Sequence, residues 1–301
     1  MLTIFACPKP FTDPHIAMIQ RNAIRSWARL DLKPRIVLFG DEPGVAGICR
    51  ELGLEHVPDV ARSEFGTPLL NDVFAQAEQR TTGRYLCYVN ADIILMSDFA
   101  RVVRSLADFR HRVRLPGGRL LLGGRPWDVP VTEPQEFRPG WEADMRRLAG
   151  ERGKLRSEWS CDYFVFAKGT WKNLPPLALG RVYFDNALLF LCRRRGGWLV
   201  DATTAVTAVH QQHEYAAHLG GDMYFKNPEA VRNAELAGGE ERVLTWSNAT
   251  HRYTPDGLRF FLWGFRSVWN PRLLVGKGWY RSFLPGRWAQ RAPQRAPRSR
   301  T

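Results

Sequence analysis

Three short segments of the sequence carry side chains that could act on a phosphate or a hydroxyl group. The first, Asn90-Ala91-Asp92, stands where the mainly apolar run Arg84–Asn90 ends, and Ile93-Ile94-Leu95 follows it. An Asp between two apolar runs is expected at the end of a strand, where it could hold a divalent cation, because Mg²⁺ and Mn²⁺ prefer oxygen ligands and phosphate. The same Asp could instead cap a helix or a turn, and the local sequence leaves both interpretations open.

The other two segments offer a carboxylate and two imidazoles. Asp185 stands near the start of a mostly apolar stretch that we expect to be helical. There it could be a general base or an anchor for an acceptor, or only a helix-start carboxylate that the macrodipole favours. His210 ends a β-type run, and His213 follows three residues later. Two histidines at this spacing could reach one cation or phosphate, whereas a single histidine at a strand end is more often structural.

Two common nucleotide-binding loops are missing. The sequence has no G-x-G-x-x-G after its first expected strand and no G-x-x-x-x-G-K-[ST], which disfavours an NAD-type dehydrogenase and a P-loop ATPase. A phosphate would then have to be held by another device, and a carboxylate that carries a divalent cation is a common one.

The elements that position these residues begin with a regular alternation of strands and helices. We expect strands at 2–7, 35–40, 54–57 and 84–90, with helices after Asp13-Pro14, from about Pro43, after a Thr67-Pro68 cap and from Ser97. This order predicts βαβ units and a parallel sheet. Ligands bind beyond the carboxyl ends of such strands, so Lys9, Asp41 and Asp92 are the residues to inspect.

The remainder of the chain is less regular. We expect strands within 113–124, a proline-rich loop at 125–139, a helix at 141–148, a strand at 162–167, a helix at 182–194, and strands at 198–200 and 204–209. The chain has 301 residues, of which 45% are hydrophobic and 24% charged, so it is expected to be globular. Its five cysteines are odd in number and widely spaced, which excludes a disulfide scaffold and favours a reducing compartment.

The net charge of +13 is concentrated near the C-terminus. Residues 257–301 contain ten Lys or Arg, no Asp or Glu, and nine aromatic residues. The remaining residues are nearly neutral, so a nucleic-acid partner is not expected. Aromatic and basic residues together suit an anionic membrane surface, and residues 258–266 could form a short helix there. The N-terminus lacks a signal peptide, and no apolar stretch is long enough to span a bilayer.

A set of short sequence segments, taken in order along the chain, resembles one family, the bacterial GT-A-fold glycosyltransferases of the nucleotide-diphospho-sugar transferase, family-2-like type. The segments span about residues 1–255 and are Thr3–Phe5, Pro8–Phe11, Gln20–Trp27, Leu38–Asp41, Gly66–Asn71, Tyr88–Ile93, Arg125–Asp128, Asp162–Phe166 and those around Asp185 and His210. The resemblance implies a Rossmann-like, mostly parallel α/β sheet flanked by helices. It covers a domain at 1–256 and leaves a basic, aromatic extension at 257–301.

The resemblance also implies a metal site for Mn²⁺ or Mg²⁺. Asn90-Ala91-Asp92 resembles the DxD motif, with Asp92 as the carboxylate that faces the metal and the diphosphate. Asn90 replaces the first Asp, which removes one negative charge from the site. His210 resembles the late histidine that completes metal or diphosphate binding, and His213 is expected to face the substrate.

Other positions acquire roles from the same resemblance. Asp41 resembles the acid that meets the nucleobase or ribose, and Lys9 and Arg21 could approach the base or the diphosphate. Asp185, 93 residues after Asp92, resembles the catalytic carboxylate. The positions expected to face the sugar and the acceptor are Trp127, Asp128, Asp162 and Asn186.

These implications predict a glycosyltransferase, of hexosyltransferase type, that moves a sugar from a nucleotide-diphosphate donor to a hydroxyl acceptor. The acceptor is expected to be a growing polysaccharide or a lipid-linked glycan. The protein itself is expected to be cytoplasmic and peripheral on the inner face of the membrane. Two alternatives stay open: a sugar nucleotidyltransferase, although the loop Ala6–Pro10 lacks the glycines such enzymes use, and a non-catalytic glycan or nucleotide reader, which Asn90 would permit.

Overall fold

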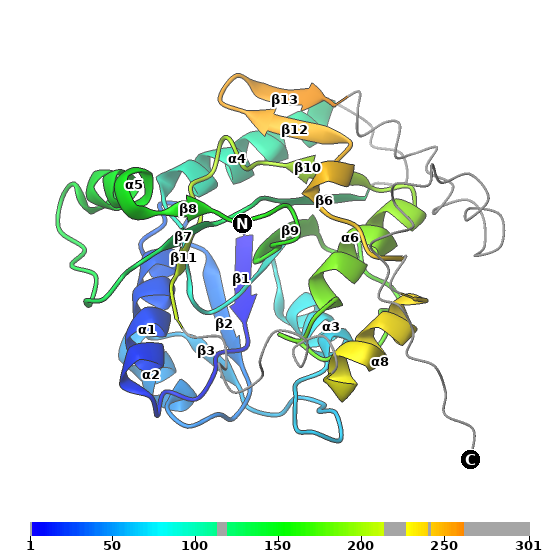
Figure 1. The fold of residues 1–301 in the computed structure, drawn as a ribbon, viewed down its shortest axis with the longest axis horizontal. Coiled ribbons are helices and arrows are strands. Elements are labelled where there is room, and N and C mark those ends of the chain that lie inside the picture. The colour runs from blue at the N-terminus through cyan, green and yellow to red at the C-terminus, as the bar shows by residue number, and fades with distance from the viewer. Residues whose placement is uncertain (1, 113–118, 214–226, 240–241, 262–301) are drawn as a thin grey trace, which may run out of the picture.

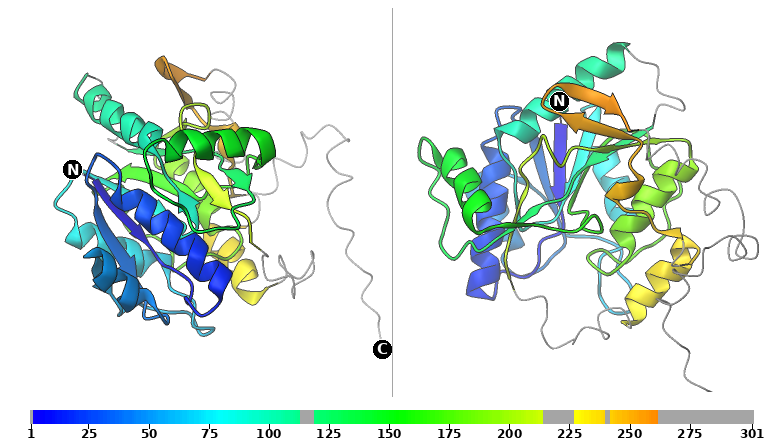
Figure 2. Two further views of the ribbon diagram at one scale, coloured as in Figure 1. Left: turned by 90° about the vertical axis from the view of Figure 1, so that its left-hand side faces the viewer. Right: turned by 45° about the horizontal axis from the view of Figure 1, so that its top comes forward.

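The computed structural model describes residues 2–112, 119–213, 227–239 and 242–261. Figures 1 and 2 show helices packed on both faces of a large sheet. The strands are β1 (Leu2–Ala6), β2 (Arg35–Phe39), β3 (Glu55–Val57), β4 (Tyr85–Val89), β5 (Ile93–Ile94), β6 (Leu120–Gly123), β7 (Trp127–Val129), β8 (Lys154–Leu155), β9 (Tyr163–Ala167), β10 (Trp198–Asp201), β11 (Val209–Gln211), β12 (His251–Thr254) and β13 (Gly257–Phe260). The helices are α1 (Pro14–Ala28), α2 (Val45–Leu52), α3 (Leu70–Arg80), α4 (Ser97–Arg112), α5 (Trp141–Arg152), α6 (Phe184–Arg194), α8 (Pro228–Ala237) and the 3₁₀ helix η3 (Trp246–Asn248).

Among the described residues, the larger sheet has nine strands in the order β13-β12-β10-β6-β9-β4-β1-β2-β3. The four strands β3, β2, β1 and β4 run parallel, as do β6, β10 and β12. β9 lies between these two groups and pairs with β4 and β6 in antiparallel fashion. The mostly parallel, helix-flanked α/β sheet expected from the sequence is therefore confirmed.

The N-terminal elements form for local reasons that the sequence reveals. Every residue of β1 is buried, and alternate side chains enter opposite cores, Ile4 on one face and Phe5 on the other. α1 begins at Pro14 because the carboxylate of Asp13 accepts a hydrogen bond from the backbone N–H of Ile16 at 2.8 Å. The expected N-cap of this helix is confirmed.

Two hydrophobic cores hold the helices against the sheet. α1, α2 and α4 share one core with side chains such as Ile4, whereas α3, α6 and α8 share the other with side chains such as Phe5. Figure 1 shows α1 and α2 together on one side of β1, with α6 and α8 on the other. The β12–β13 hairpin lies at one end of the sheet, as the turned views also show (Figure 2).

A second sheet of four short strands, in the order β5-β11-β7-β8, lies beside the carboxyl end of β4. β11 pairs with β5 in antiparallel fashion and with β7 in parallel, so that His210 lies opposite Ile93 on one side and Asp128 on the other. This sheet joins four segments that are separated in the sequence. It thereby places the turn after β4 next to the two histidines.

Some expected elements differ in the structure. Thr67 does not cap α3, which begins at Leu70 after Leu69, because the Thr67 hydroxyl donates a hydrogen bond to Glu229 instead. The proline-rich stretch 125–139 contains β7, and of the strand expected at 204–209 only Val209 is in a ladder, because β11 runs from Val209 to Gln211. Residues 113–118 lie outside the described residues.

The start of the expected C-terminal extension belongs to the large sheet. Residues 257–260 form β13, where the sequence predicted the start of a helix at 258–266. β13 pairs with β12 from His251↔Phe260 to Thr254↔Gly257. The residues from 262 onward lie outside the described part of the chain. Among the described helices, none combines the length and the apolar character needed to cross a membrane.

Candidate active site

Asp92, His210 and His213 form a compact cluster at the carboxyl edge of β4. The Nε2 atom of His213 lies 3.0 Å from Oδ2 of Asp92, and Nε2 of His210 lies 3.7 Å from the same oxygen. One candidate ligand atom of each residue lies within 4.8 Å of the others. The two residues of the expected metal set, Asp92 and His210, are thus brought together, and His213 joins them.

The residues of this cluster fit a divalent cation. Two atoms that bind one ion at about 2.1 Å in neighbouring octahedral positions lie roughly 3.0 Å apart, close to the Asp92–His213 separation. Oδ1 of Asp92 is buried, and none of the described residues donates a hydrogen bond to it. A carboxylate oxygen and imidazole nitrogens are a donor set that Mn²⁺ accepts.

Asp128 orients one histidine of the cluster. His210 is only 1% exposed, and its Nδ1 donates a hydrogen bond to Oδ1 of Asp128 at 2.7 Å, which leaves Nε2 directed toward Asp92. A carboxylate behind a ligating histidine is the usual support of such ligands, because it fixes the tautomer and the ring orientation. Asp128, expected to face the sugar or the acceptor, therefore supports His210 in the structure, although it also borders an open hollow beside His213.

Positive charge around the cluster keeps Asp92 ionised. Burial alone would raise the pKa of Asp92, but the hydrogen bond from His213 and the charges of His210, His213 and Lys9 outweigh it and hold the pKa at about 2. Asp92 is therefore a carboxylate throughout the neutral range. This is the protonation state that a metal ligand needs.

Asn90 holds its place by hydrogen bonds rather than by charge. Its Nδ2 donates to Oδ1 of Asp162 at 2.8 Å, and its Oδ1 accepts from the Tyr88 hydroxyl at 3.1 Å. An Asp at position 90 would face the Asp162 carboxylate without a proton between them. The amide at this position and the carboxylate at position 162 therefore complement each other, which gives a physical reason for the departure from the DxD pattern.

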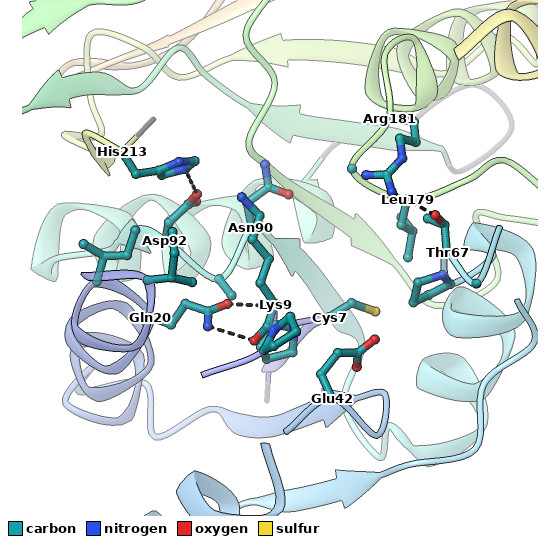
Figure 3. A pocket seen from close by; sticks show the side chains of 18 of the residues that line it. Cys7, Lys9, Gln20, Glu42, Thr67, Asn90, Asp92, Leu179, Arg181 and His213 are labelled. Carbon is teal, nitrogen blue, oxygen red and sulfur yellow. Dashed lines mark hydrogen bonds and ion pairs between the residues drawn. The ribbon is translucent and has the colours of Figure 1, made fainter. Parts of the chain in front are cut away.

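A cavity of about 290 Å³ opens beside the cluster. Figure 3 shows Asp92 and His213 on one wall, Thr67, Leu179 and Arg181 on the opposite wall, and Lys9 and Asn90 between them. The backbone of Lys9 is clasped by Gln20, whose Oε1 accepts from the Lys9 N–H at 2.6 Å and whose Nε2 donates to the Lys9 carbonyl at 3.0 Å. α1 thus fixes the loop that carries the positively charged side chain of Lys9.

The acid that faces the cavity after β2 is Glu42, not Asp41. Glu42 lines the cavity, and its Oε2 is buried with no hydrogen-bond donor among the described residues. The Asp41 side chain is 70% exposed and pairs with Arg62. Arg21, the other expected base or diphosphate contact, pairs with Glu51 on α2 and does not line the cavity.

Asp185 lies in the first turn of α6, next to Phe184. The neighbouring Phe184 ring lies 6.1 Å from the ring of Tyr88, which lines the cavity. Burial is the main cause that raises the pKa of Asp185 to about 7; the backbone N–H of Asn186 opposes it, and the charge of Asp162 adds to it. Asp185 therefore has the titration range of a general base, although it does not itself line the cavity.

Burial also raises the pKa of Asp162, whose Oδ2 accepts no hydrogen bond from the described residues.

The remaining expected residues have structural partners. The Nδ2 of Asn186 donates to the Leu244 carbonyl at 2.8 Å and holds the segment before η3 against α6. Trp127 packs against a small core under the second sheet. The structure therefore does not bring Asn186 to the cavity, and it gives Trp127 a packing role.

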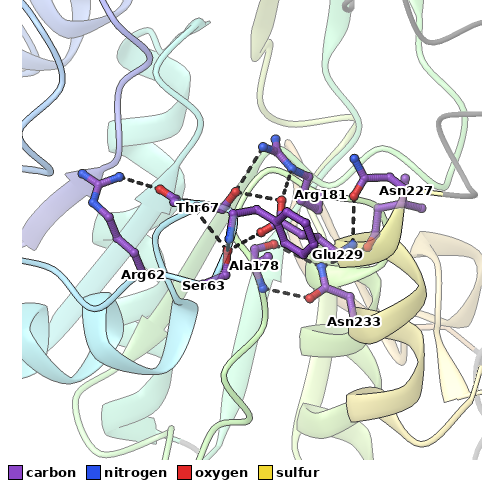
Figure 4. A network of polar contacts seen from close by, with 11 residues as sticks. Arg62, Ser63, Thr67, Ala178, Arg181, Asn227, Glu229 and Asn233 are labelled. Atoms are coloured by element: carbon purple, nitrogen blue, oxygen red, sulfur yellow. Dashed lines mark hydrogen bonds and ion pairs between the residues drawn. The ribbon is translucent and has the colours of Figure 1, made fainter.

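A buried carboxylate that the sequence did not single out supports the far wall. Glu229 on α8 is 3% exposed and accepts hydrogen bonds from the hydroxyls of Ser63 and Thr67 and from Nε of Arg181, as Figure 4 shows. Burial alone would raise the pKa of Glu229, but these bonds outweigh it and lower the pKa. Thr67 and Arg181, which both line the cavity, are thus fixed from one helix.

No family model matches the sequence, and no curated protein matches it. Among solved structures, the chain is similar to a glucosyl-3-phosphoglycerate synthase from Mycobacterium tuberculosis, crystallised with Mn²⁺, UDP and glucosyl-3-phosphoglycerate. The two are 13% identical, with a TM-score of 0.47 and 87% of each chain covered. For a mannosyltransferase from Pyrobaculum calidifontis with GDP-Man and Mn²⁺, the identity is 13%, the TM-score is 0.44, and 72% of this chain and 58% of that chain are covered.

A third similar structure is that of S. aureus TarS 1-349, with 12% identity and a TM-score of 0.31 over 44% of this chain; the match spans only 41% of that protein. The topology of this chain has a mostly parallel sheet with helices on both faces, as the sequence resemblance implied, and a short second sheet beside the Asp92 turn.

Proposed function

We propose that the chain is a glycosyltransferase that moves a sugar from a nucleotide-diphosphate donor to a hydroxyl acceptor. The observation that carries the proposal is the Asp92–His210–His213 cluster, which lies at the carboxyl edge of β4 and opens into a cavity that also exposes Lys9 and Arg181. A divalent cation held there would neutralise the charge that develops on a leaving diphosphate.

The residues of the cavity divide the binding of a donor between them. Asp92, His210 and His213 hold the cation, and Lys9, close enough for its charge to act on Asp92, meets the diphosphate. Glu42 accepts a hydrogen bond from the base or the ribose, because it lines the cavity and its Oε2 has no donor among the described residues, whereas its Oε1 accepts from Arg62 at 2.9 Å. In this role Glu42 replaces the neighbouring Asp41.

Asp185 is proposed as the general base that removes the proton from the acceptor hydroxyl if the anomeric centre inverts. With a pKa of about 7, its carboxylate would be ionised in a large fraction of molecules at neutral pH and basic enough to accept that proton. Because Asp185 is not among the residues that line the donor cavity, the acceptor would approach it from the side of α6.

A thermal-shift panel tests donor binding directly. Nucleoside diphosphates are added to the full chain with and without Mn²⁺, and a ligand present at 100 times its Kd should stabilise the fold by about 2.7 kcal/mol. Asp92→Ala should melt normally and lose the metal-dependent part of the shift. If no nucleoside diphosphate stabilises the wild type under either condition, the proposal fails.

Donor hydrolysis then separates an enzyme from a binding module. Release of the nucleoside diphosphate from a stabilising nucleotide sugar, in the absence of an acceptor, is expected from the wild type. Binding without release would indicate a non-catalytic reader. Release of pyrophosphate from a nucleoside triphosphate and a sugar phosphate would instead indicate a nucleotidyltransferase.

The donor sugar, the acceptor and the location of the reaction belong to the same proposal. We infer a hexosyl donor and an acceptor that is a polysaccharide or a lipid-linked glycan at the cytoplasmic face of a membrane. The donor and the acceptor rest on the sequence resemblance. The membrane setting is supported by the C-terminal sequence, whose basic and aromatic residues suit an anionic lipid surface.

A further inference from the structure

Gln211 stands between the two histidines of the cluster in sequence and is completely buried. Its side-chain Nε2 donates to the backbone carbonyl of Ile19 at 2.7 Å and to that of Asp92 at 2.9 Å, and its Oε1 accepts from Nδ2 of Asn22 at 3.0 Å. Both N–H groups and the oxygen of this amide therefore have partners. Gln211 is neither a candidate ligand nor a cavity-lining residue, so the proposed mechanism gives it no task.

The backbone ladder alone holds Asp92 loosely against the histidines. β5 has only two residues, and its pairing with β11 ends at His210↔Ile93. Beyond that pair, the Gln211 N–H lies 3.4 Å from the Asp92 carbonyl, near the limit of a hydrogen bond. The bond from the Gln211 side chain to the same carbonyl is 0.5 Å shorter, so the side chain makes the stronger contact.

The other end of the amide is anchored in α1. Asn22 is 2% exposed, and besides its bond to Gln211 its Oδ1 accepts from the backbone N–H of Gln135 at 2.8 Å. α1 also carries Gln20, which clasps the backbone of Lys9. One helix therefore holds both the metal cluster and the loop that carries Lys9 in place.

We propose that Gln211 is a positioning residue for the metal site. Its amide ties the Asp92 carbonyl to α1 and β11, so that the Asp92 carboxylate faces His210 and His213 at separations that one cation can bridge. The inference rests on the proposed metal site and assigns a cause to its geometry. Loss of an outer partner of a metal ligand typically lowers metal affinity by about 10–100-fold.

The test measures Mn²⁺ binding by calorimetry on the full chain without nucleotide, in Gln211→Met and in a matched control, Asn233→Leu. Each substitution replaces a buried amide with an apolar side chain and removes the side-chain hydrogen bonds to three partner groups. For Asn233, these are the N–H and carbonyl of Ala178 and the carbonyl of Val182. Gln211→Met should bind Mn²⁺ about 10–100-fold more weakly, whereas Asn233→Leu should melt earlier and keep wild-type Mn²⁺ affinity.

Gln211→Glu separates the effect of positioning on Mn²⁺ affinity from the effect of charge. It also replaces Gln211→Met as the test variant if Gln211→Met does not fold. A carboxylate cannot donate to the carbonyls of Ile19 and Asp92, so positioning predicts weaker Mn²⁺ binding. A purely electrostatic effect of the added negative charge predicts tighter binding. Asn22→Ala, which removes only the far anchor, should give a smaller loss of affinity than either Gln211 variant.

The outcomes distinguish this inference from the proposed function. A wild type that binds no Mn²⁺ overturns the metal site itself. A wild type that binds Mn²⁺, together with Gln211 variants that bind it equally well or with Asn233→Leu losing as much affinity as Gln211→Met, overturns only the role of Gln211.

Discussion

Asn90 and Asp162 form a pair in which the residue type at one position depends on the residue type at the other. The amide of Asn90 donates to one carboxylate oxygen of Asp162, and the remaining oxygen is buried without a donor among the described residues. Burial already raises the pKa of Asp162, so a second carboxylate at position 90 would add repulsion where water cannot screen it. A motif search that requires two acids would miss this site, because the pairing is visible only in three dimensions.

This pairing predicts the effect of restoring the acid. Asn90→Asp should lower the melting temperature, and more at pH 8, where both carboxylates are ionised, than at pH 5, where a shared proton can bridge them. It should not strengthen Mn²⁺ binding in proportion to its added charge. Thermal unfolding across this pH range is the measurement. The swap Asn90→Asp with Asp162→Asn restores a donor and an acceptor and should recover most of the loss; a swap no better than the single variant contradicts the pairing.

A second prediction at this scale concerns Asp185. Because its pKa is about 7, a base at this position should make kcat/KM rise about tenfold per pH unit below 7 and level off above it. Asp185→Asn should lower turnover about 10²–10⁴-fold and abolish that rise, with donor affinity nearly unchanged. Asp59→Asn, at an exposed position, is the control. An unchanged pH profile in Asp185→Asn removes the residue from the chemistry.

The same pKa has a consequence for stability. The folded-state pKa of Asp185 lies above its ordinary value, so the folded chain binds the extra proton, and the stability contributed by protonated Asp185 is lost as the pH rises from about 4 to 7. Asp185→Asn should then melt higher than the wild type at pH 8 but not at pH 4. A variant that is less stable at pH 8 would instead indicate a carboxylate that stabilises the start of α6.

At the scale of elements, the sequence predicts best where local chemistry decides. The Asp13-Pro14 start of α1 and the alternating burial of β1 follow from residue type and are found in the structure. Thr67 shows the limit: it looks like a helix cap, but its hydroxyl is taken by Glu229, 162 residues away. Likewise β7 lies in a proline-rich stretch because it pairs with β11, which no local pattern encodes.

The residues of the candidate site also differ in whether local sequence could predict them. Asp92 and His210 could be found from their positions after strands, and Asp185 from its place near a helix start. Gln211, Glu229 and Arg181 could not, because their importance comes from partners brought by other elements. Asn227-Pro228 does signal the start of α8, since Asn227 caps it and Pro228 follows, yet nothing in the sequence indicates that Glu229 is buried against Ser63 and Arg181.

The burial of Glu229 yields a prediction for α8. Glu229→Ala leaves the hydroxyls of Ser63 and Thr67 and the Arg181 guanidinium without their acceptor and should cost about 3 kcal/mol, at the low end for a broken buried ion pair because Arg181 is partly exposed. Denaturant unfolding measures this loss. Glu235→Gln, an exposed position on the same helix, should change stability by less than about 0.5 kcal/mol. Equal effects of the two substitutions would contradict the role of Glu229.

At the scale of the whole molecule, the sheet brings the active residues to one edge. β4 and β9 run antiparallel, so the end of β4 and the start of β9 meet, and Asn90 reaches Asp162 there. The second sheet adds His210 from β11 at the same edge. The proposed metal ligands and the proposed base therefore come from segments spread from residue 92 to residue 213. Such a site depends on the entire domain folding as one unit.

The last prediction concerns the C-terminal sequence and the boundary that the structure gives it. Because β13 belongs to the sheet, shortening the chain at Thr254 would remove an edge strand, so the shortened chain must end at Phe261. The removed residues 262–301 carry nine Lys or Arg and no Asp or Glu. Each basic residue near an anionic surface contributes about 1 kcal/mol, and interfacial aromatic residues add to this. The full chain should therefore sediment with anionic vesicles, less with neutral ones and less at high salt, whereas residues 1–261 should stay in solution with an unchanged melting temperature. Equal sedimentation of both chains, or of neither, would assign the C-terminal residues a role other than membrane attachment.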